Sequence, residues 1–196
     1  DSSEQATAHD PPGPGARWRA GPTARSGQTL LRLLREPELV GQLAIFAHGR
    51  LDVGVEFGAG ASPYPVPLEC RVLFADRLGH QDLTGELYPG QIAEDLIHPD
   101  LITDLETCGL IADASVDFLI ACHVIEHTRD PIGAIVQAWR RLRPGGSLVL
   151  AVPARDRTFD RERETTPLAH LVLDFERPDR ARDYAHYEEF YARAFH

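Results

Sequence analysis

"VEFGAGASPYPVPLECRVLFAD", residues 55–76, decides the fold, because it joins two apolar runs through a glycine turn and a proline-rich link. The first run ends at Glu56 before a Gly-Ala-Gly turn, and the second run ends at Asp76. The link contains three prolines, at positions 63, 65 and 67, which would break a helix. We therefore predict two strands joined by a short crossover that has no long helix.

Other short apolar runs predict the rest of a sheet. The predicted strands are residues 51–57, 71–75, 100–103, 116–121 and 147–153. A helix is predicted over 131–143, with Pro131 in its first turn and Gly145–Gly146 beyond its end. Buried strands that alternate with crossovers indicate an α/β fold with a doubly wound, mostly parallel sheet and helices on both faces.

The outer segments complete one expected domain, residues 27–196, which suits a chain of 196 residues. Residues 1–26 are rich in Pro, Gly, Ser and Ala and predict a flexible leader. Periodic leucines predict helical cover over 27–50, residues 51–153 form the sheet core, and 154–196 form a helical cap. Aromatic residues of the cap are predicted as core anchors, namely Phe175, Tyr184, Tyr187, Phe190 and Tyr191.

The composition of the chain argues against nucleic acids and membranes as binding partners. The formal net charge of −10 disfavours a nucleic-acid binder, which needs a basic face. No run approaches the roughly 18 apolar residues of a membrane span, and the first residues lack the apolar stretch of a secretory signal. The three cysteines contain no CxxC pair, so we expect reduced, buried thiols at Cys70, Cys108 and Cys122. A cytoplasmic protein without nucleic-acid or membrane partners is expected.

The carboxyl ends of parallel strands are where ligands bind in such folds. The residues at those ends are Glu56 to Ser62, Asp76, Asp104, Ala121 to His123, and Pro153 onward. This edge of the sheet is therefore the candidate site.

Residues 101–153 carry the most specific pattern. An acidic residue after the third strand is followed by "ADASVD", "HVIEH" and "LRPGGSLVLAVP" in that order. In this arrangement, residues 51–155 resemble a class I S-adenosylmethionine-dependent methyltransferase of the type-11 kind. The segment "RDRTFDRERETTPLAHLVLDFE", residues 155–176, further resembles a subgroup often encoded beside glycosyltransferases.

The resemblance implies S-adenosylmethionine as cofactor and a set of cofactor-binding residues. These are Glu56, Gly58, Gly60, Ser62 in place of a third glycine, Asp76, Asp104, Leu105, Cys122 and His123. Asp76 would accept from the ribose hydroxyls, Asp104 from the adenine amino group, and Leu105 would supply a backbone amide. The alternatives are an ordinary strand-to-loop turn for the glycines, a solvated Asp76 and a helix cap at Asp104.

His123 follows the fourth strand, where the resemblance places the transferred methyl group. It can orient the acceptor or take a proton, and Asp160 or His170 can serve as the base. Arginines within 154–176 can bind an acidic acceptor group, the alternative being a solvated charge run. His123, Glu126 and His127 also have metal-ligand spacing on a helix face, although the family usually carries this sequence without metal, and we expect none.

The sequence thus predicts methyl transfer to an oxygen or nitrogen of a small-molecule acceptor, with the subgroup resemblance pointing to a sugar or glycan precursor. The alternative is a methyltransferase-like accessory domain that binds cofactor weakly or is not catalytic. The short first crossover favours that alternative, and so does the lack of a recognisable antiparallel strand pair after the fifth strand. An unpaired fifth strand would expose a sheet edge, which a homodimer or the N-terminal segment would cover.

Overall fold

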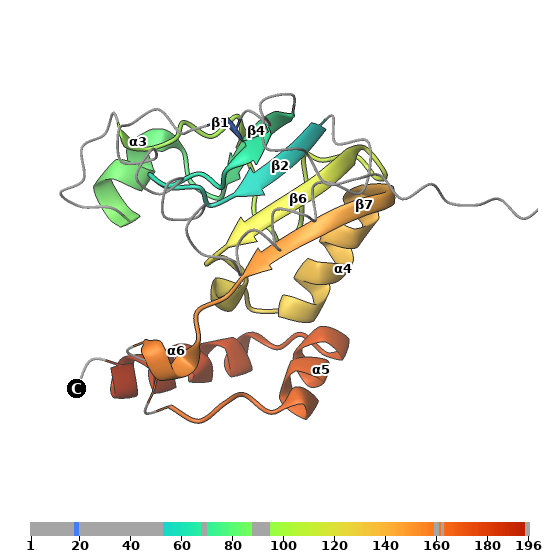
Figure 1. Cartoon of the computed structure of the whole chain (residues 1–196). Coiled ribbons are helices and arrows are strands. Elements are labelled where there is room, and N and C mark those ends of the chain that lie inside the picture. The colour runs from blue at the N-terminus through green and yellow to red at the C-terminus, as the bar shows by residue number, and fades with distance from the viewer. Residues whose placement is uncertain are drawn as a thin grey trace, which may run out of the picture.

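The computed structural model describes residues 18–19, 53–67, 70–87, 95–158, 161 and 163–194. Five parallel strands form the central sheet in the order β5-β4-β2-β6-β7 (Figure 1). They are β2 (Val53–Phe57), β4 (Arg71–Asp76), β5 (Leu101–Ile102), β6 (Val116–Cys122) and β7 (Leu142–Ala151). The chain runs outward from β2 to β5 and then returns to the other side of β2, which confirms the predicted doubly wound parallel sheet.

Shorter elements surround this sheet. A two-stranded ribbon pairs β1 (Trp18–Arg19) with β3 (Val66–Pro67). The helical elements are α3 (His80–Asp82), the π-helical η2 (Leu83–Leu87), the 3-10 turns η4 (Ile125–His127) and η5 (Arg155–Arg157), and the helices α4 (Pro131–Arg141), α5 (Leu168–Glu176) and α6 (Arg180–Ala194).

The first crossover has the predicted form. Its described residues, 58–67 and 70, contain turns and the short strand β3 but no helix. Because β3 pairs with β1, Trp18–Arg19 adopt strand structure within the segment predicted to be a flexible leader. The rest of 1–52, including the predicted helical cover over 27–50, lies outside the described residues.

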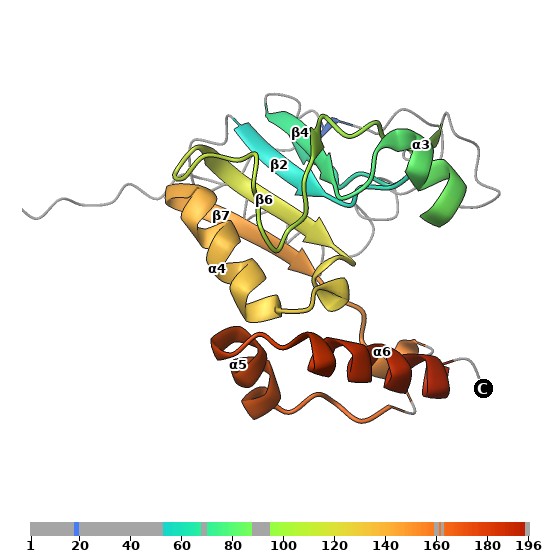
Figure 2. The same cartoon turned by 180° about the vertical axis from the view of Figure 1, so that it is seen from behind.

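Strand β6 is buried on both faces, as expected for the centre of a parallel sheet. On one face, Leu119 and Ala121 belong to a core cluster with Ala134 and Ala138 of α4. Figures 1 and 2 show α4 running along this face. On the other face, Phe118 and Ile120 form a second cluster, to which Val66 and Cys70 of the first crossover contribute. All three cysteines of the chain are free, as predicted, but only Cys70 and Cys108 are buried, whereas Cys122 is partly buried.

Helix α4 begins where the sequence predicts and ends slightly earlier. The Asp130 side chain accepts from the Gly133 N–H at 2.8 Å, and Pro131 is the first helical residue. The predicted strand 147–153 in fact begins at Leu142, because the Pro-Gly-Gly stretch is taken into β7. A register irregularity opposite β6, between Val116 and Phe118, absorbs these extra residues.

Helices α5 and α6 form the cap that follows β7. Both views show them together beyond the carboxyl end of the sheet, on the side of α4 (Figures 1 and 2). No strand follows β7 among the described residues, so β7 stands at the edge of the described sheet. None of the helices described is both long and apolar enough to cross a bilayer.

The prediction that the cap aromatics are core anchors was wrong for most of them. The exposed fractions are 41 % for Phe175, 71 % for Tyr184, 52 % for Tyr187 and 64 % for Tyr191. These rings face outward because the side-chain contacts described between α5 and α6 are largely polar.

The approach of β2 to β6 is the tightest feature of the core. Gly54 pairs with Phe118, and a Cβ at Gly54 would lie 2.0 Å from the Phe118 ring. The Phe118 side chain is fully buried, so it has no room to move aside. Glycine at this position therefore sets how closely the two central strands pack.

Gly54→Ala should lower the free energy of unfolding by about 1–3 kcal/mol or more, because a methyl group would overpack the Phe118 ring. The matched control is Gly85→Ala in η2, where no atom lies within 4 Å of the added Cβ. The control should be neutral or stabilising by up to about 1 kcal/mol. Urea unfolding of both variants measures this, and equal stabilities would contradict the packing account.

Candidate functional site

The candidate site lies where the strand order reverses, between β2 and β6. The two strands are parallel, and their last paired residues are Phe57 and Ala121. Beyond them, the glycine turn follows β2, while Cys122 ends β6 and His123 follows it. Ligands of open α/β sheets bind at this topological switch point, because the two crossovers depart in opposite directions and leave a crevice.

Glu56 is the most unusual residue at this edge. Its side chain is only 2 % exposed, and Oε1 accepts from the Tyr64 N–H at 2.8 Å. Oε2 is buried and has no hydrogen-bond partner among the described residues. Burial raises the pKa of Glu56 to about 8, against the opposing effect of the Tyr64 N–H. The carboxyl group therefore either holds a proton or awaits a donor from a ligand.

The glycine turn is held in a conformation that favours glycine. Gly58 and Gly60 have φ of +64° and +53°. A Cβ at Gly58 would lie 2.7 Å from a methyl group of Val124, so the turn packs closely against the residue before η4. The Gly60 carbonyl accepts from the Ile97 N–H at 2.8 Å. The exposed Ser62 closes a local turn through its own N–H.

Asp76 ends β4, as predicted, and lies beside the start of the glycine turn. The Gly58 N–H donates to the carbonyl of Ala75 at 2.9 Å, which joins the two strand ends. Asp76 Oδ1 accepts from the Leu78 N–H at 3.2 Å. Partial burial raises the pKa of Asp76, while the N–H groups of Leu78 and Arg77 lower it. Glu56, Gly58 and Asp76 thus lie at the neighbouring ends of β2 and β4.

Asp104 has the local contacts that the helix-cap alternative describes, although at a turn rather than a helix. Its Oδ1 accepts from both the N–H and the hydroxyl of Thr107, each at 2.8 Å. The Leu105 side chain is 3 % exposed and belongs to the core, and its carbonyl accepts from the Cys108 thiol at 3.4 Å. The predicted adenine contacts of Asp104 and Leu105 stay predictions.

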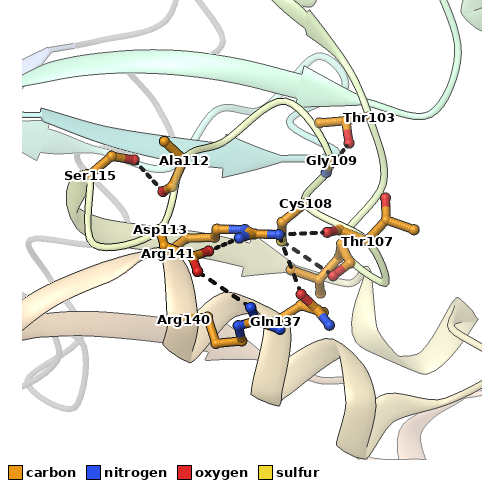
Figure 3. Close-up of polar contacts among 11 residues, drawn as sticks. Thr103, Thr107, Cys108, Gly109, Ala112, Asp113, Ser115, Gln137, Arg140 and Arg141 are labelled. Atoms are coloured by element: carbon orange, nitrogen blue, oxygen red, sulfur yellow. Dashed lines mark hydrogen bonds and ion pairs between the residues drawn. The ribbon is translucent and has the colours of Figure 1, made fainter.

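The segment that carries Asp104 is fixed by the end of α4, which the sequence analysis did not anticipate (Figure 3). Arg141 Nη2 donates to the Thr107 carbonyl at 3.2 Å and to Gln137 Oε1 at 3.4 Å. Arg141 also pairs with Asp113, and Arg140 reaches the same carboxylate at 3.3 Å. The sequence signal that could have indicated these contacts was the pair of basic residues in the last turn of the predicted helix.

A second contact joins this segment to the residues between η4 and α4. Arg129, after η4, donates hydrogen bonds to Glu106 from both its backbone N–H and its guanidinium. The guanidinium Nη2 donates to Oε2 at 2.8 Å. This contact raises the pKa of Arg129, and the charges of Asp183 and Tyr187 on α6 add to the effect.

Cys122, the last residue of β6, and His123, the residue after it, differ in burial and backbone conformation. The Cys122 thiol is partly buried, and burial followed by the charge of Glu56 raises its pKa to about 12, so it is no nucleophile at neutral pH. His123 has a φ of +57°, which is rare for a residue with a side chain. Its side chain is 66 % exposed, and Nδ1 lies 3.5 Å from Glu126 Oε1.

The shared helix face proposed for His123, Glu126 and His127 does not form. Only Ile125–His127 are helical, as a single 3-10 turn, and His123 precedes it in a left-handed conformation. The contact found for the set is the one between His123 and Glu126.

The other candidate residues are not gathered at the strand ends by any contact described. Asp160 lies outside the described residues. His170 is on α5, where Nε2 lies 2.6 Å from His186 Nε2. Arg163 pairs with Glu189 at 2.5 Å and stacks over the Phe190 ring at 5.2 Å. Within the segment predicted to bind an acidic acceptor, Arg163 therefore helps to hold the cap together.

Comparison with protein families gives a match over most of the central sheet. Residues 55–150 match the family described as a methyltransferase domain. Comparison with curated proteins gives no match.

Solved structures give distant likenesses. An S-adenosylmethionine-dependent methyltransferase of Thermotoga maritima, described as a possible histamine N-methyltransferase, is 22 % identical with a TM-score of 0.43. An arsenic(III) S-adenosylmethionine methyltransferase of Chlamydomonas reinhardtii is 17 % identical with a TM-score of 0.38. The likenesses cover 70 % and 62 % of this chain, but only 62 % and 47 % of the respective structures. A methyltransferase of Aquifex aeolicus is 13 % identical with a TM-score of 0.40, covering 75 % of this chain and 86 % of its own.

The matched residues contain the glycine turn and all five strands except the first two residues of β2 and the last of β7. This match covers just under half of the chain, and it supports the predicted resemblance to the class I S-adenosylmethionine-dependent methyltransferases of the type-11 kind. S-adenosylmethionine is the cofactor that this family implies.

The unusual carboxyl group of Glu56 predicts a pH dependence of stability. Its pKa is about 8 in the folded chain and 4.5 in the reference state, so the folded state binds the extra proton between these values. Stability contributed by Glu56 is therefore present below pH 4.5 and lost as the pH rises through 8.

Glu56→Gln should remove this loss, because the amide stays neutral. Its free energy of unfolding relative to the wild type should rise from pH 5 to pH 9 by an amount on the order of a few kcal/mol. Urea unfolding at several pH values measures this, with the exposed Glu176→Gln as control. A constant difference between wild type and Glu56→Gln across the range would contradict the buried, neutral carboxyl group.

Proposed function

We propose that the protein transfers a methyl group from S-adenosylmethionine to a small-molecule acceptor at the carboxyl edge of the sheet. The observation that carries this proposal is that the buried Glu56, the left-handed Gly58 and the strand-end Asp76 lie at the neighbouring ends of β2 and β4. Glu56 and Asp76 offer carboxylate acceptors for the ammonium and hydroxyl donors of an adenosyl amino acid, and the glycine turn lies between them along the chain.

The fit is clearest at Glu56. A buried acceptor without a partner among the described residues is costly, and a ligand donor at Oε2 would satisfy it. An ammonium group there would also favour the ionised carboxylate, so binding would release the proton that burial retains. Asp76 is half-buried at the next strand end, where a carboxylate can accept from both hydroxyls of a ribose.

The short first crossover changes how the carboxylate of the ligand is held. No helix begins behind the glycine turn among the described residues, so the helix-dipole contribution, about 0.3–1 kcal/mol at an exposed helix end, is missing there. The Gly58 and Ser62 amides already donate within the protein, so the amides between them would carry this contact. The proposal therefore predicts binding that depends strongly on Glu56 and Asp76.

His123 is the proposed acceptor-side residue. S-adenosylmethionine supplies a sulfonium methyl that is already reactive, so transfer needs chiefly proximity and orientation. The His123 imidazole is exposed at the end of β6, and the nearby Glu126 carboxylate can orient it. An acceptor hydroxyl or ammonium that must lose a proton would lose it to this imidazole. A sugar or glycan acceptor rests on the subgroup resemblance of 155–176 alone.

Asp76→Asn should weaken binding of S-adenosylhomocysteine to the full chain by about 10- to 100-fold, because hydrogen bonds to a charged acceptor are lost. Isothermal titration calorimetry measures this, with Asp82→Asn on the exposed side of α3 as the matched control. The control should bind as the wild type does. No heat from wild-type protein at millimolar ligand would instead favour the non-catalytic accessory domain, and equal affinity of Asp76→Asn would remove Asp76 from the site.

His123→Gln should slow methyl transfer by about 100-fold or more while changing cofactor affinity little, because it removes a proton acceptor and not a cofactor contact. The assay follows a radiolabelled methyl group from S-adenosylmethionine into a panel of sugars, amines and phenols. His127→Gln, an exposed histidine of the same turn, is the control and should retain activity. A His123→Gln variant that is as fast as the wild type would show that this imidazole has no part in transfer.

A further inference from the structure

The cap contains a cluster of ligand-type side chains that lies apart from the proposed methyl-transfer residues. His170 and Asp174 are four residues apart on α5 and therefore share a helix face. His186 approaches them from α6. Among the residues that the structure describes, these three form a group whose ligand atoms all lie within 4.8 Å of one another.

The atoms that face one another are the ones that bind metals. His170 Nε2 lies 2.6 Å from His186 Nε2 and 3.1 Å from Asp174 Oδ2, and His186 Nε2 lies 3.8 Å from the same oxygen. Tetrahedral zinc with bonds of about 2.0–2.1 Å separates its ligand atoms by about 3.3 Å. The three observed separations bracket that value, so small side-chain rotations would bring the atoms around one ion.

The Asp174 carboxylate is also oriented in a way that suits metal binding. Asp174 is 7 % exposed, and its second oxygen, Oδ1, accepts from Arg182 Nε at 2.6 Å. The Arg182 guanidinium further donates to the carbonyls of Leu173 and Arg177 at the end of α5. Oδ2 is thereby turned toward the two imidazoles. Such an outer hydrogen bond, which orients a ligating side chain, is a usual part of metal sites.

A bound ion would stabilise the contact between α5 and α6. The side-chain contacts described between α5 and α6 are the polar ones of His170, Asp174, Arg182 and His186, whereas several large apolar side chains of the two helices face outward. Two imidazole nitrogens at 2.6 Å require that at least one carries no proton toward the other. A cation between them would satisfy both lone pairs and the carboxylate together.

We propose that His170, Asp174 and His186 bind one divalent transition-metal ion, of which zinc is the best fit, and that this ion joins α5 to α6. Two imidazoles and a carboxylate suit zinc, and also cobalt or nickel, better than magnesium or calcium. Three protein ligands leave a further position for water or a small anion. The site does not depend on the proposed methyl transfer, and His170 as a ligand would be unavailable as a base.

The experiment titrates the metal-free full chain with zinc in competition with a chromophoric chelator. The wild type should bind one equivalent, and His186→Gln and Asp174→Asn should each weaken binding at least about tenfold. His127→Gln removes a histidine elsewhere and should leave the affinity unchanged. Cobalt in place of zinc should give visible absorption bands in the wild type that both cluster variants lose. Far-UV circular dichroism checks that the variants fold.

X-ray absorption at the zinc edge of the wild-type protein gives a test without substitutions. Scattering from two imidazoles and an oxygen ligand supports the site, and a zinc shell without imidazole overturns it. The proposal is also overturned if the wild type binds no zinc at 100-fold excess, or if His186→Gln and the wild type bind it equally well. Calorimetry with S-adenosylhomocysteine on the same samples reads the cofactor site separately.

Discussion

The parallel pairing of β2 with β6 is the constraint on which the site depends. Gly54 lets the Phe118 ring lie against the backbone of β2, so the two central strands stay in register up to Phe57 and Ala121. That register brings the glycine turn and His123 to the same edge of the sheet. The reversal of strand order at this pair then keeps both crossovers away from the edge. Core packing and ligand access are therefore set by the same contact.

Glu56 shows what this arrangement costs the folded chain. Its carboxyl group is buried with one oxygen unmatched among the described residues, which a fold selected for stability alone would avoid. A ligand that donates to Oε2 would offset this cost, which links the strain of the free protein to binding. The first crossover has no described helix to attract an anion, so in the proposed cofactor site side-chain acids and backbone amides would carry the recognition.

The sequence predicted the sheet well because buried strands and their bounding turns are local patterns. The proline-rich link correctly excluded a crossover helix, and Asp130-Pro131 correctly marked the start of α4. Three features were not foreseen. The Pro-Gly-Gly stretch entered β7 because a strand irregularity absorbed it, Arg141 found partners 28 residues away in Asp113, and His170 met His186 across two helices. Each depends on contacts between distant segments, which no local pattern encodes. The prediction that the cap aromatics are buried was wrong for the same reason, since apolar character alone does not say which face of a helix is covered.

The central claim is that the acidic residues at neighbouring strand ends hold one nucleoside-containing ligand. A crystal structure of the full chain grown with S-adenosylhomocysteine tests it most directly. The account predicts the ribose within hydrogen-bonding distance of Asp76, the amino acid portion beside Gly58, and a ligand donor on Glu56 Oε2. A ligand found elsewhere, or strand ends covered by the link between β2 and β4 in saturating ligand, would contradict it.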